Sequence, residues 1–253
     1  VRGWGNREWL RDGIFGSVNT WAANPLQPVN YLESHDDMAF ADELSDHPQK
    51  DGRMPTDREA AINRLAATVL FTSLGKTMIY EGQEFLRSKW GIMNTYNRGD
   101  AVNAVRWTDC SQPLRRQALD YYTGLIHLRT SPEGASFRVA QRPPQSYYRW
   151  LLPSNPKVMG YLVNAPSLHA GNGFAVLLNA DDSEQRLPVA LRGPSAWRMI
   201  GNGHEINLAG VAPVGAPAGQ APPVWAPEWQ GDIVIPPLSS VIPLQSLSRP
   251  SQI

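Results

Sequence analysis

The spacing of apolar residues changes once along the chain, near residue 133. Before this point, segments with a helical period alternate with short apolar runs that suit strands. After it, short β-type runs separated by turn residues follow one another, and no helical period is found. The change predicts two units: an α/β unit over residues 1–132 and an antiparallel β-sandwich domain over residues 133–253.

Three helices are predicted in the first unit. A short one is expected over residues 7–18, where the apolar positions follow a helical spacing. Thr56 and Glu59 have the spacing of a capping box, and the apolar period that follows stops at Gly75. The third helix is expected over residues 114–129, where apolar residues recur at intervals of three and four.

Two short strands are predicted in the same unit, over residues 28–33 and 77–80. Polar segments, which we expect to be long loops, follow them over residues 42–55 and 84–107. Strands that alternate with helices in this way indicate a parallel sheet. Both strands run into polar residues at their C-terminal ends, where α/β barrels hold their active sites.

Charged residues crowd the end of the first strand. Glu33, His35, Asp36 and Asp37 occur within five positions, directly after an apolar run. From the residues alone, a salt-bridged strand end is the more common explanation of such a cluster. A functional explanation needs the neighbouring segments to fit as well.

The neighbouring segments resemble a known family. "YLESHDD" resembles the end of the seventh barrel strand of α-amylase-superfamily glycoside hydrolases, where the strand ends in His-Asp. "GKTMIYEGQEF" is similar to their eighth strand, with Thr77 at a position that is usually Pro, and "YYTGLIHLR" is similar to their last barrel helix. The order and separation of the three segments agree with the family, which favours the functional explanation.

Three further stretches narrow the resemblance to one group of these enzymes. "GQEFLRSKWG", "NTYNRGDAVNAVRW" and "LRDGIFGSV" are similar to pullulanase-type debranching enzymes. The resemblance implies the C-terminal part of a (β/α)8 TIM barrel followed by the β-sandwich domain that this superfamily carries. It also implies part of a retaining hydrolase that cleaves α-1,6-glucosidic branch linkages in pullulan, starch or glycogen. An amylase-type or branching-type α-glucan enzyme is the near alternative.

The resemblance also implies roles for individual residues. Asp36 corresponds to the catalytic carboxylate that stabilises the transition state, and His35 would hydrogen-bond the same sugar. Asp100 matches a substrate-contacting Asp of the debranching enzymes. Tyr96 and Asn97 are further substrate-binding candidates on the same loop.

Four residues are predicted to support this site. Glu33 should lie on the same strand face as His35 and act as its structural partner. Asp37 would make a loop contact. Tyr80 would line the sugar site or pack within the barrel, and Glu84 would be either a supporting acid or a buried, hydrogen-bonded structural residue.

The nucleophile and the general acid of the family are the main departure. They lie on the fourth and fifth barrel strands of these enzymes, and no segment of residues 1–27 resembles either motif. Some relatives carry an Arg four residues after the Asp that corresponds to Asp100, and Ala104 stands there in this chain. We therefore expect a C-terminal portion whose partner is the N-terminal part of the same enzyme. The isolated chain should be inactive.

Composition excludes other classes of function. Lys+Arg and Asp+Glu both total 23, so the zero net charge does not favour nucleic-acid binding. No apolar run approaches the ~20 residues that span a bilayer, which argues against a membrane partner. Cys110 is the single cysteine, in a polar loop that does not suggest a nucleophile. No cofactor is predicted: calcium is common in the superfamily, but no loop here has a calcium-binding pattern. The sequence does not predict a cellular location.

A function of another class stays open. A noncatalytic carbohydrate-binding or interaction module could combine a remnant of a barrel with a β-sandwich. The coding sequence upstream of the chain would distinguish the two, because only an enzyme needs the Asp and Glu strand-end motifs there.

Overall fold

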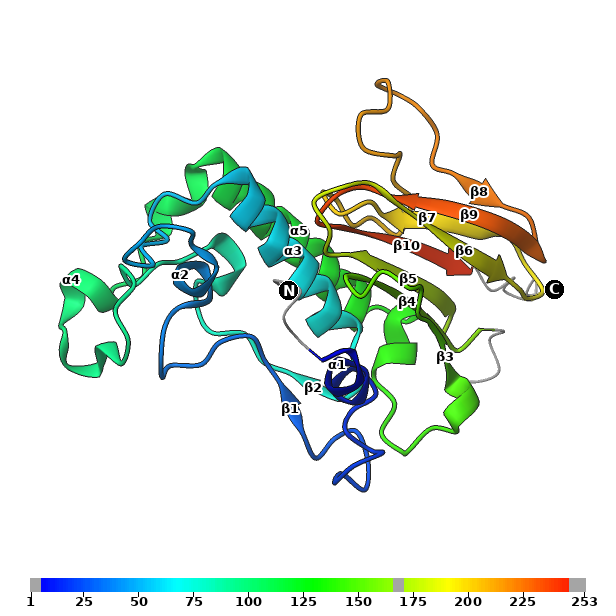
Figure 1. Cartoon of the computed structure of the whole chain (residues 1–253), viewed down its shortest axis with the longest axis horizontal. Helices are drawn as coiled ribbons and strands as arrows, with labels where there is room; N and C mark the ends of the chain where they lie inside the picture. The colour runs from blue at the N-terminus through cyan, green and yellow to red at the C-terminus, as the bar shows by residue number, and fades with distance from the viewer. Residues whose placement is uncertain (1–5, 166–170, 246–253) are drawn as a thin grey trace.

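The elements of the chain form three zones that lie side by side (Figure 1). The computed structural model describes residues 6–165 and 171–245. An antiparallel sheet forms one side, and helices α3 (Asp57–Thr72) and α5 (Pro113–Thr130) pack against it. A loop region with two short helices lies on the far side of α3 and α5 (Figure 1).

The sheet contains six strands in the order β3-β4-β5-β10-β7-β8, and every neighbouring pair is antiparallel. Strands β6 and β9 form a separate antiparallel pair. The antiparallel β structure predicted after residue 133 is therefore confirmed. The bounds are β3 (Tyr148–Leu151), β4 (Val158–Val163), β5 (Gly173–Asn179), β6 (Gln185–Leu191), β7 (Trp197–Gly201), β8 (Val224–Trp225), β9 (Trp229–Ile235) and β10 (Ser239–Gln245).

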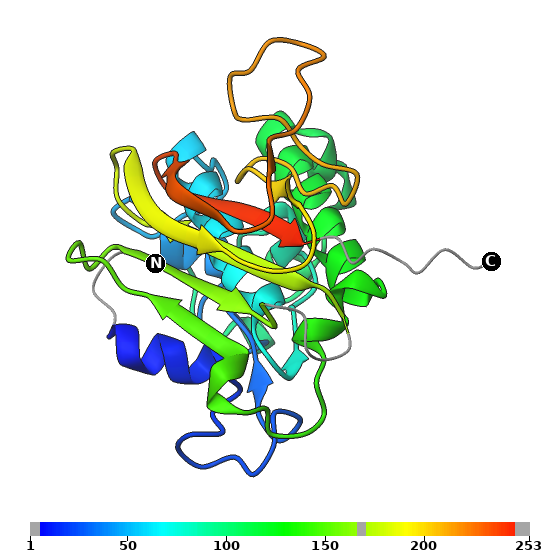
Figure 2. The ribbon, with the colours of Figure 1, turned by 90° about the vertical axis from the view of Figure 1, so that its right-hand side faces the viewer.

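Both faces of the central strands are covered. Along β4, Tyr161 and Val163 belong to the core shared with the helices, whereas Leu162 belongs to the core shared with β6 and β9. Phe174 and Ala175 of β5 alternate in the same way. Side chains of a strand alternate between faces, so burial on both sides explains why these strands are continuous apolar runs. Figure 2 shows the strands in front of the helices.

Helix α3 begins where the sequence predicts it. The Thr56 hydroxyl accepts a hydrogen bond from Glu59 N at 3.2 Å, and the Glu59 carboxylate accepts one from Thr56 N at 2.8 Å. This capping box satisfies two N–H groups at the start of the helix. Helix α1 (Arg7–Ile14) is shorter than predicted. The chain turns at Gly16, whose φ of 74° falls in the left-handed region, and a side chain there would press on Pro25.

Buried hydroxyl groups hold α3 on the sheet. Thr68 Oγ1 lies 2.7 Å from Tyr121 Oη and 3.2 Å from Ser240 Oγ, so it joins α3 to α5 and β10. Thr72 Oγ1 lies 2.6 Å from Tyr161 Oη on β4. One hydrophobic core therefore extends across residue 133, and the division into units at residues 132 and 133 stays a prediction.

The two predicted strands of the first unit form a parallel pair. Strand β1 (Val29–Asn30) pairs with β2 (Lys76–Thr77), and Met78 N extends the pairing by donating to Asn30 O at 2.9 Å. The parallel direction confirms the prediction. The predicted ranges 28–33 and 77–80 are too long, because the chain leaves extended pairing soon after Asn30 and Thr77.

Short helices occupy segments that were predicted to be loops. Residues 42–55 overlap α2 (Phe40–Leu44), and residues 84–107 contain four helical turns. Two 3-10 turns also follow residue 133, where no helical period was expected. These turns are too brief to produce a recognisable period. They are η1 (Gln83–Phe85), η2 (Thr95–Asn97), α4 (Asp100–Asn103), η3 (Trp107–Ser111), η4 (Glu133–Phe137) and η5 (Gln145–Tyr147).

A buried arginine joins the end of α3 to the end of α5. Arg129 Nη1 donates to Phe71 O at 2.6 Å and to Ser73 O at 2.8 Å. Its Nη2 donates to Gly75 O and, at 3.2 Å, to Phe137 O. Phe71 and Ser73 lie at the end of α3, where helix carbonyls lack partners within the helix. Burial lowers the pKa of Arg129 to about 10, which leaves the guanidinium charged at neutral pH.

We predict that Arg129→Lys lowers the free energy of unfolding by ~3 kcal/mol, because an ammonium cannot reach four carbonyl oxygens from one planar group. Urea unfolding followed by circular dichroism measures the change. Arg116→Lys is the matched control, since exposed Arg116 pairs with Asp120 one helical turn away. An equal, small effect of both substitutions would show that the carbonyl cluster does not depend on the guanidinium.

Candidate functional site

The polar ends of β1 and β2 leave the sheet at the same edge. The two strands are parallel neighbours, so residues 31–38 and 78–84 begin side by side. The first of these segments carries Glu33, His35 and Asp36, and the second carries Tyr80 and Glu84. The structure thus brings together the two polar strand ends predicted from the sequence.

His35 and Asp36 are open to solvent. Their side chains are 80% and 70% exposed, and His35 Nε2 lies 3.4 Å from Asp36 Oδ1. Asp36 N donates to Ser34 Oγ at 3.4 Å. Within the described part of the chain, this is the one ion pair that Asp36 makes. The pair can therefore present a carboxylate and an imidazole to a ligand.

Glu33 lies in a different environment from His35. Its side chain is buried, it accepts a hydrogen bond from Phe40 N, and among the described residues its Oε1 has no hydrogen-bond partner. The prediction that Glu33 and His35 share a strand face is wrong, because the strand ends at Asn30 and the following backbone is irregular. Glu33 points into the protein while His35 faces water.

Burial raises the pKa of Glu33 to about 7. Desolvation disfavours the carboxylate form, and Asp42 adds a smaller effect in the same direction. The Phe40 N–H and the cations of Lys89 and Arg87 oppose this shift without cancelling it. Glu33 is therefore a buried acid that changes protonation near neutral pH.

Tyr80 is covered by two cations. Lys89 Nζ lies 4.6 Å and Arg87 Cζ 5.4 Å from the centre of its ring, and both basic side chains are buried. Cations at such positions are attracted to the face of an aromatic ring. Glu84 accepts a hydrogen bond from Gly82 N at 2.9 Å and so closes the turn after Tyr80.

Asp37 connects the His35–Asp36 segment to the loop of residues 84–107. Its N–H donates to Asn94 Oδ1, and its carbonyl accepts from Asn94 N, each at 3.2 Å. Asp37 and Asn94 both have positive φ, at 59° and 51°. Asn is tolerated in the left-handed region, and the double contact holds Asp37 there as well.

Tyr96, Asn97 and Asp100 lie on the surface of this loop. All three are exposed, and Tyr96 is 88% accessible. Thr95 and Asn103 close the loop through hydrogen bonds of 2.6 Å and 2.7 Å. Asp100 begins α4, and no contact found among the described residues joins it to Asp36. The predicted substrate-binding residues thus form two exposed groups connected through Asp37 and Asn94.

Other classes of site gain no support from the geometry. In the ranges 6–165 and 171–245, no three His, Cys, Asp or Glu side chains gather as a metal-binding group. The helices of the same ranges are too short or too polar to cross a membrane. Burial raises the pKa of Cys110, with further effects from Glu84 and Asp109. A reactive cysteine would show the opposite shift.

Comparisons with known proteins agree with this arrangement. No family model matches the chain. Over 134 residues it is 33% identical to the pullulanase of Bacillus subtilis (strain 168). The chain is a pullulanase relative. The match covers 51% of this chain and 18% of the Bacillus subtilis protein, so the chain spans less than a fifth of that protein's length. The resemblance to pullulanase-type enzymes drawn from the sequence is confirmed.

Solved pullulanase structures share the fold. Pullulanase from Bacillus acidopullulyticus superposes with a TM-score of 0.76 at 24% identity, over 96% of this chain and 28% of that one. The pullulanase of Anoxybacillus sp. LM18-11 complexed with maltotetraose gives 0.73 at 21% identity, over 97% and 32%. The described pullulanase-like fold is thus present in both, as part of a longer chain.

Three charged residues near the site were not predicted from the sequence. Arg87 and Lys89 lie over Tyr80, and the buried Asp42 accepts hydrogen bonds from Gly52 N, Ser88 Oγ and Lys89 N at 2.6–2.8 Å. Arg87 and Lys89 are two positions apart within "EFLRSKW", a mixed apolar and basic stretch. That mixture is the one signal in the sequence that these charges are buried, since solvated charges seldom alternate with large apolar residues.

We predict that Glu33 makes this pullulanase relative less stable as the pH rises from about 4.5 to 7. Because the pKa is raised in the folded state, the folded chain holds its proton when the unfolded chain has lost it. The loss is roughly 3 kcal/mol at most, at 1.36 kcal/mol per pKa unit. Glu33→Gln should flatten this part of the profile, which urea unfolding at several pH values measures.

Glu8→Gln is the control for this experiment, because Glu8 is exposed and pairs with Arg11 on α1. It should leave the pH dependence as in the wild type. An unchanged slope in Glu33→Gln would mean that Glu33 does not titrate between these pH values in the folded chain.

Proposed function

We propose that this chain is part of a retaining α-glucan hydrolase that cleaves α-1,6-glucosidic branch linkages. The observation that carries the proposal is the exposed His35–Asp36 pair at the end of β1, in a chain with the fold of pullulanases. One of these pullulanases was solved with maltotetraose, which supports an α-glucan as the ligand.

In the proposed reaction, Asp36 accepts hydrogen bonds from sugar hydroxyls next to the reacting carbon. These bonds strengthen as positive charge develops on the sugar ring, so the carboxylate lowers the barrier. His35 donates to the same sugar. Asp100, Tyr96 and Asn97 bind units further along the glucan from the exposed loop.

The barrel is part of the same proposal. Strands β1 and β2 are parallel, α3 connects them, and α5 follows β2. We infer that they are neighbouring strands of a (β/α)8 barrel, because this order of elements is its repeating unit. A hydrolase that retains the anomeric configuration requires a nucleophile and an acid/base carboxyl group about 5 Å apart. The proposal places both groups on the part of the enzyme that precedes these strands.

A noncatalytic carbohydrate-binding module is the second candidate. It is favoured by the ion pair of Asp36, which among the described residues joins this carboxylate to a histidine. The two candidates agree on the ligand and differ on hydrolysis.

We predict that the purified 253-residue chain releases no reducing ends from pullulan, because one carboxylate cannot serve as nucleophile, acid and stabiliser together. A reducing-sugar assay measures this. Hydrolysis that survives Asp36→Asn would contradict both the predicted inactivity and the role of Asp36.

We also predict that Asp36→Asn and His35→Ala each weaken maltotetraose binding about tenfold, the loss expected for one charge-assisted hydrogen bond. Calorimetry or chemical-shift titration measures the dissociation constant. Asp120→Asn and His127→Ala on α5 are matched controls and should bind as the wild type does. Equal affinity in all four variants would remove His35 and Asp36 from the sugar site.

The coding sequence upstream of the chain distinguishes the two candidate functions. Strand-end Asp and Glu motifs in the same reading frame would support the hydrolase. Their absence, together with maltotetraose binding that depends on Asp36, would support the binding module.

A further inference from the structure

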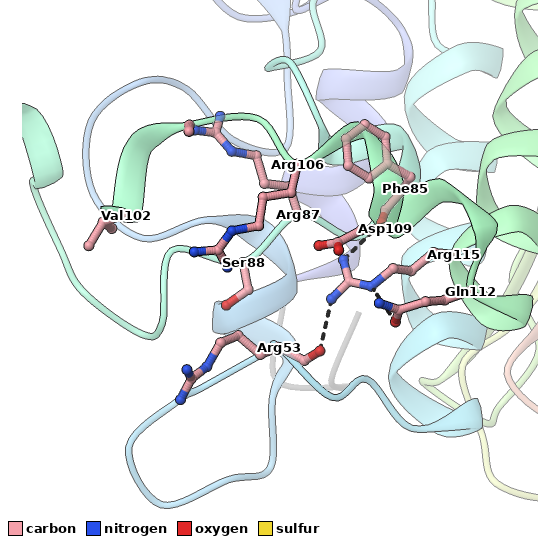
Figure 3. A pocket seen from close by; sticks show the side chains of 10 residues that line it. Arg53, Phe85, Arg87, Ser88, Val102, Arg106, Asp109, Gln112 and Arg115 are labelled. Carbon is pink, nitrogen blue, oxygen red and sulfur yellow. Dashed lines mark hydrogen bonds between the residues drawn. The ribbon is translucent and has the colours of Figure 1, made fainter. Parts of the chain in front are cut away.

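A cavity rich in arginine lies beside the loop of residues 84–107 (Figure 3). Its volume is about 150 Å³, and Arg53, Arg87, Arg106 and Arg115 line it together with one carboxylate, that of Asp109. The four arginines come from separate segments: the loop before α3, the turn after η1, the segment after α4 and the first turn of α5. Folding therefore gathers cations that are far apart in the sequence.

Among the described residues, three of these arginines form no ion pair with a carboxylate. Arg53 forms an ion pair with Asp51, with an N–O distance of 2.6 Å. Arg115 and Arg87 instead donate to backbone carbonyls, and Arg106 donates to Ala101 O at 2.8 Å. In the part of the chain that the structure describes, none of these three guanidinium groups forms an ion pair.

Two of the unpaired guanidinium groups are buried. Arg87 is 6% exposed and Arg115 is 2% exposed. Arg87 Nε is buried and, among the described residues, has no hydrogen-bond partner. Burial also lowers the pKa of Arg115, and the charges of Asp109 and Asp42 oppose this shift without cancelling it. A buried charge without a counterion is costly, and the cost falls when an anion binds beside it.

The carboxylates of the region do not balance the cations. Asp42 accepts its hydrogen bonds from two backbone N–H groups and the Ser88 hydroxyl, and Asp51 is engaged by Arg53. Asp109 remains as the acidic group in the cavity wall. Glu33, which interacts electrostatically with Arg87, has a pKa of about 7 and is only partly ionised at neutral pH. With Lys89 nearby, positive charge remains in excess.

We propose that the arginine cavity binds a phosphate-type oxyanion, either free orthophosphate or the phosphoryl group of a phosphorylated sugar. Guanidinium groups form paired hydrogen bonds with phosphate oxygens. The volume corresponds to roughly five water molecules, which suits one phosphate group. Phe85 and Val102 form an apolar part of the wall, and low polarity there strengthens the attraction between ligand and arginines.

This site is separate from the proposed glucan site. His35 and Asp36 do not line the cavity. Arg87 lies over the Tyr80 ring and donates to Asn103 O, and Arg106 donates to Ala101 O, so the cavity adjoins the loop that carries Asp100. The proposed phosphate site and the proposed glucan site can therefore be tested independently, because each has its own set of variants.

The test is a titration of the 253-residue chain with orthophosphate against sodium chloride of equal ionic strength. Calorimetry gives the dissociation constant, and thermal unfolding gives the shift in Tm. We expect saturable binding and a rise in Tm with phosphate only. Arg106→Gln should weaken binding about tenfold, the value of one charge-assisted contact. Arg106 is exposed, so this variant should keep its fold.

Arg87→Gln removes the buried unpaired cation and should weaken binding at least as much. Arg116→Gln on the outer surface of α5 is the matched control and should bind phosphate as the wild type does. Equal binding by Arg106→Gln and Arg116→Gln would overturn the proposal, as would a Tm shift that sodium chloride reproduces.

Glucose 1-phosphate and orthophosphate, compared in the same titration, distinguish the two sources of the phosphate group. Tighter binding of glucose 1-phosphate than of orthophosphate would assign the cavity to a phosphorylated sugar, and the reverse order to the free ion. Either order supports an oxyanion site. No binding of either compound would overturn it and would leave the arginines as contacts for a carboxylate of another protein segment.

Discussion

The Arg129 guanidinium is the contact on which the arrangement of the first half of the chain depends. It binds carbonyl oxygens at the end of α3, at the entry to β2 and in the segment after α5. These carbonyls would otherwise be buried without partners, since a helix leaves its last carbonyls unsatisfied. The position at which α3 ends determines the position at which β2 starts. The pairing of β2 with β1 then positions the His35–Asp36 segment. A single buried cation therefore determines the position of a site that it does not touch.

The packing of α3 makes the sheet part of the same framework. Thr68 and Thr72 hydrogen-bond to hydroxyl groups of Tyr121, Ser240 and Tyr161, and the core around them includes side chains of the helices and of five strands. Buried hydroxyl pairs have direction, unlike apolar contacts, so they fix the angle and register of α3 on the sheet. The antiparallel sheet consequently supports α3, which connects the two strands whose ends carry the candidate site.

Local signals in the sequence were enough for the two long helices, but not for the surroundings of the candidate site. The capping box of Thr56 and Glu59 and the period of α5 involve residues within a few turns, and both helices were predicted correctly. The lengths of β1 and β2 could not be predicted, because contacts such as Asp37 with Asn94 bend the chain away from the sheet. The same holds for Glu33: a residue two positions from His35 is buried because distant segments cover it.

Net charge shows why the arginine cavity could not be found from composition. A formal charge of zero bears on the long-range field that attracts polyanions, and fields between exposed charges fade within about 10 Å in salt solution. Buried guanidinium groups such as those of Arg87 and Arg115 obey a different balance, because screening is weak around them and each charge must be matched within a few ångströms. Among the described residues, Arg87 is matched by carbonyl oxygens and the Tyr80 ring, and Arg115 by carbonyl oxygens and the Gln112 side chain. A neutral chain can therefore lack affinity for nucleic acid and still hold a site for one small anion.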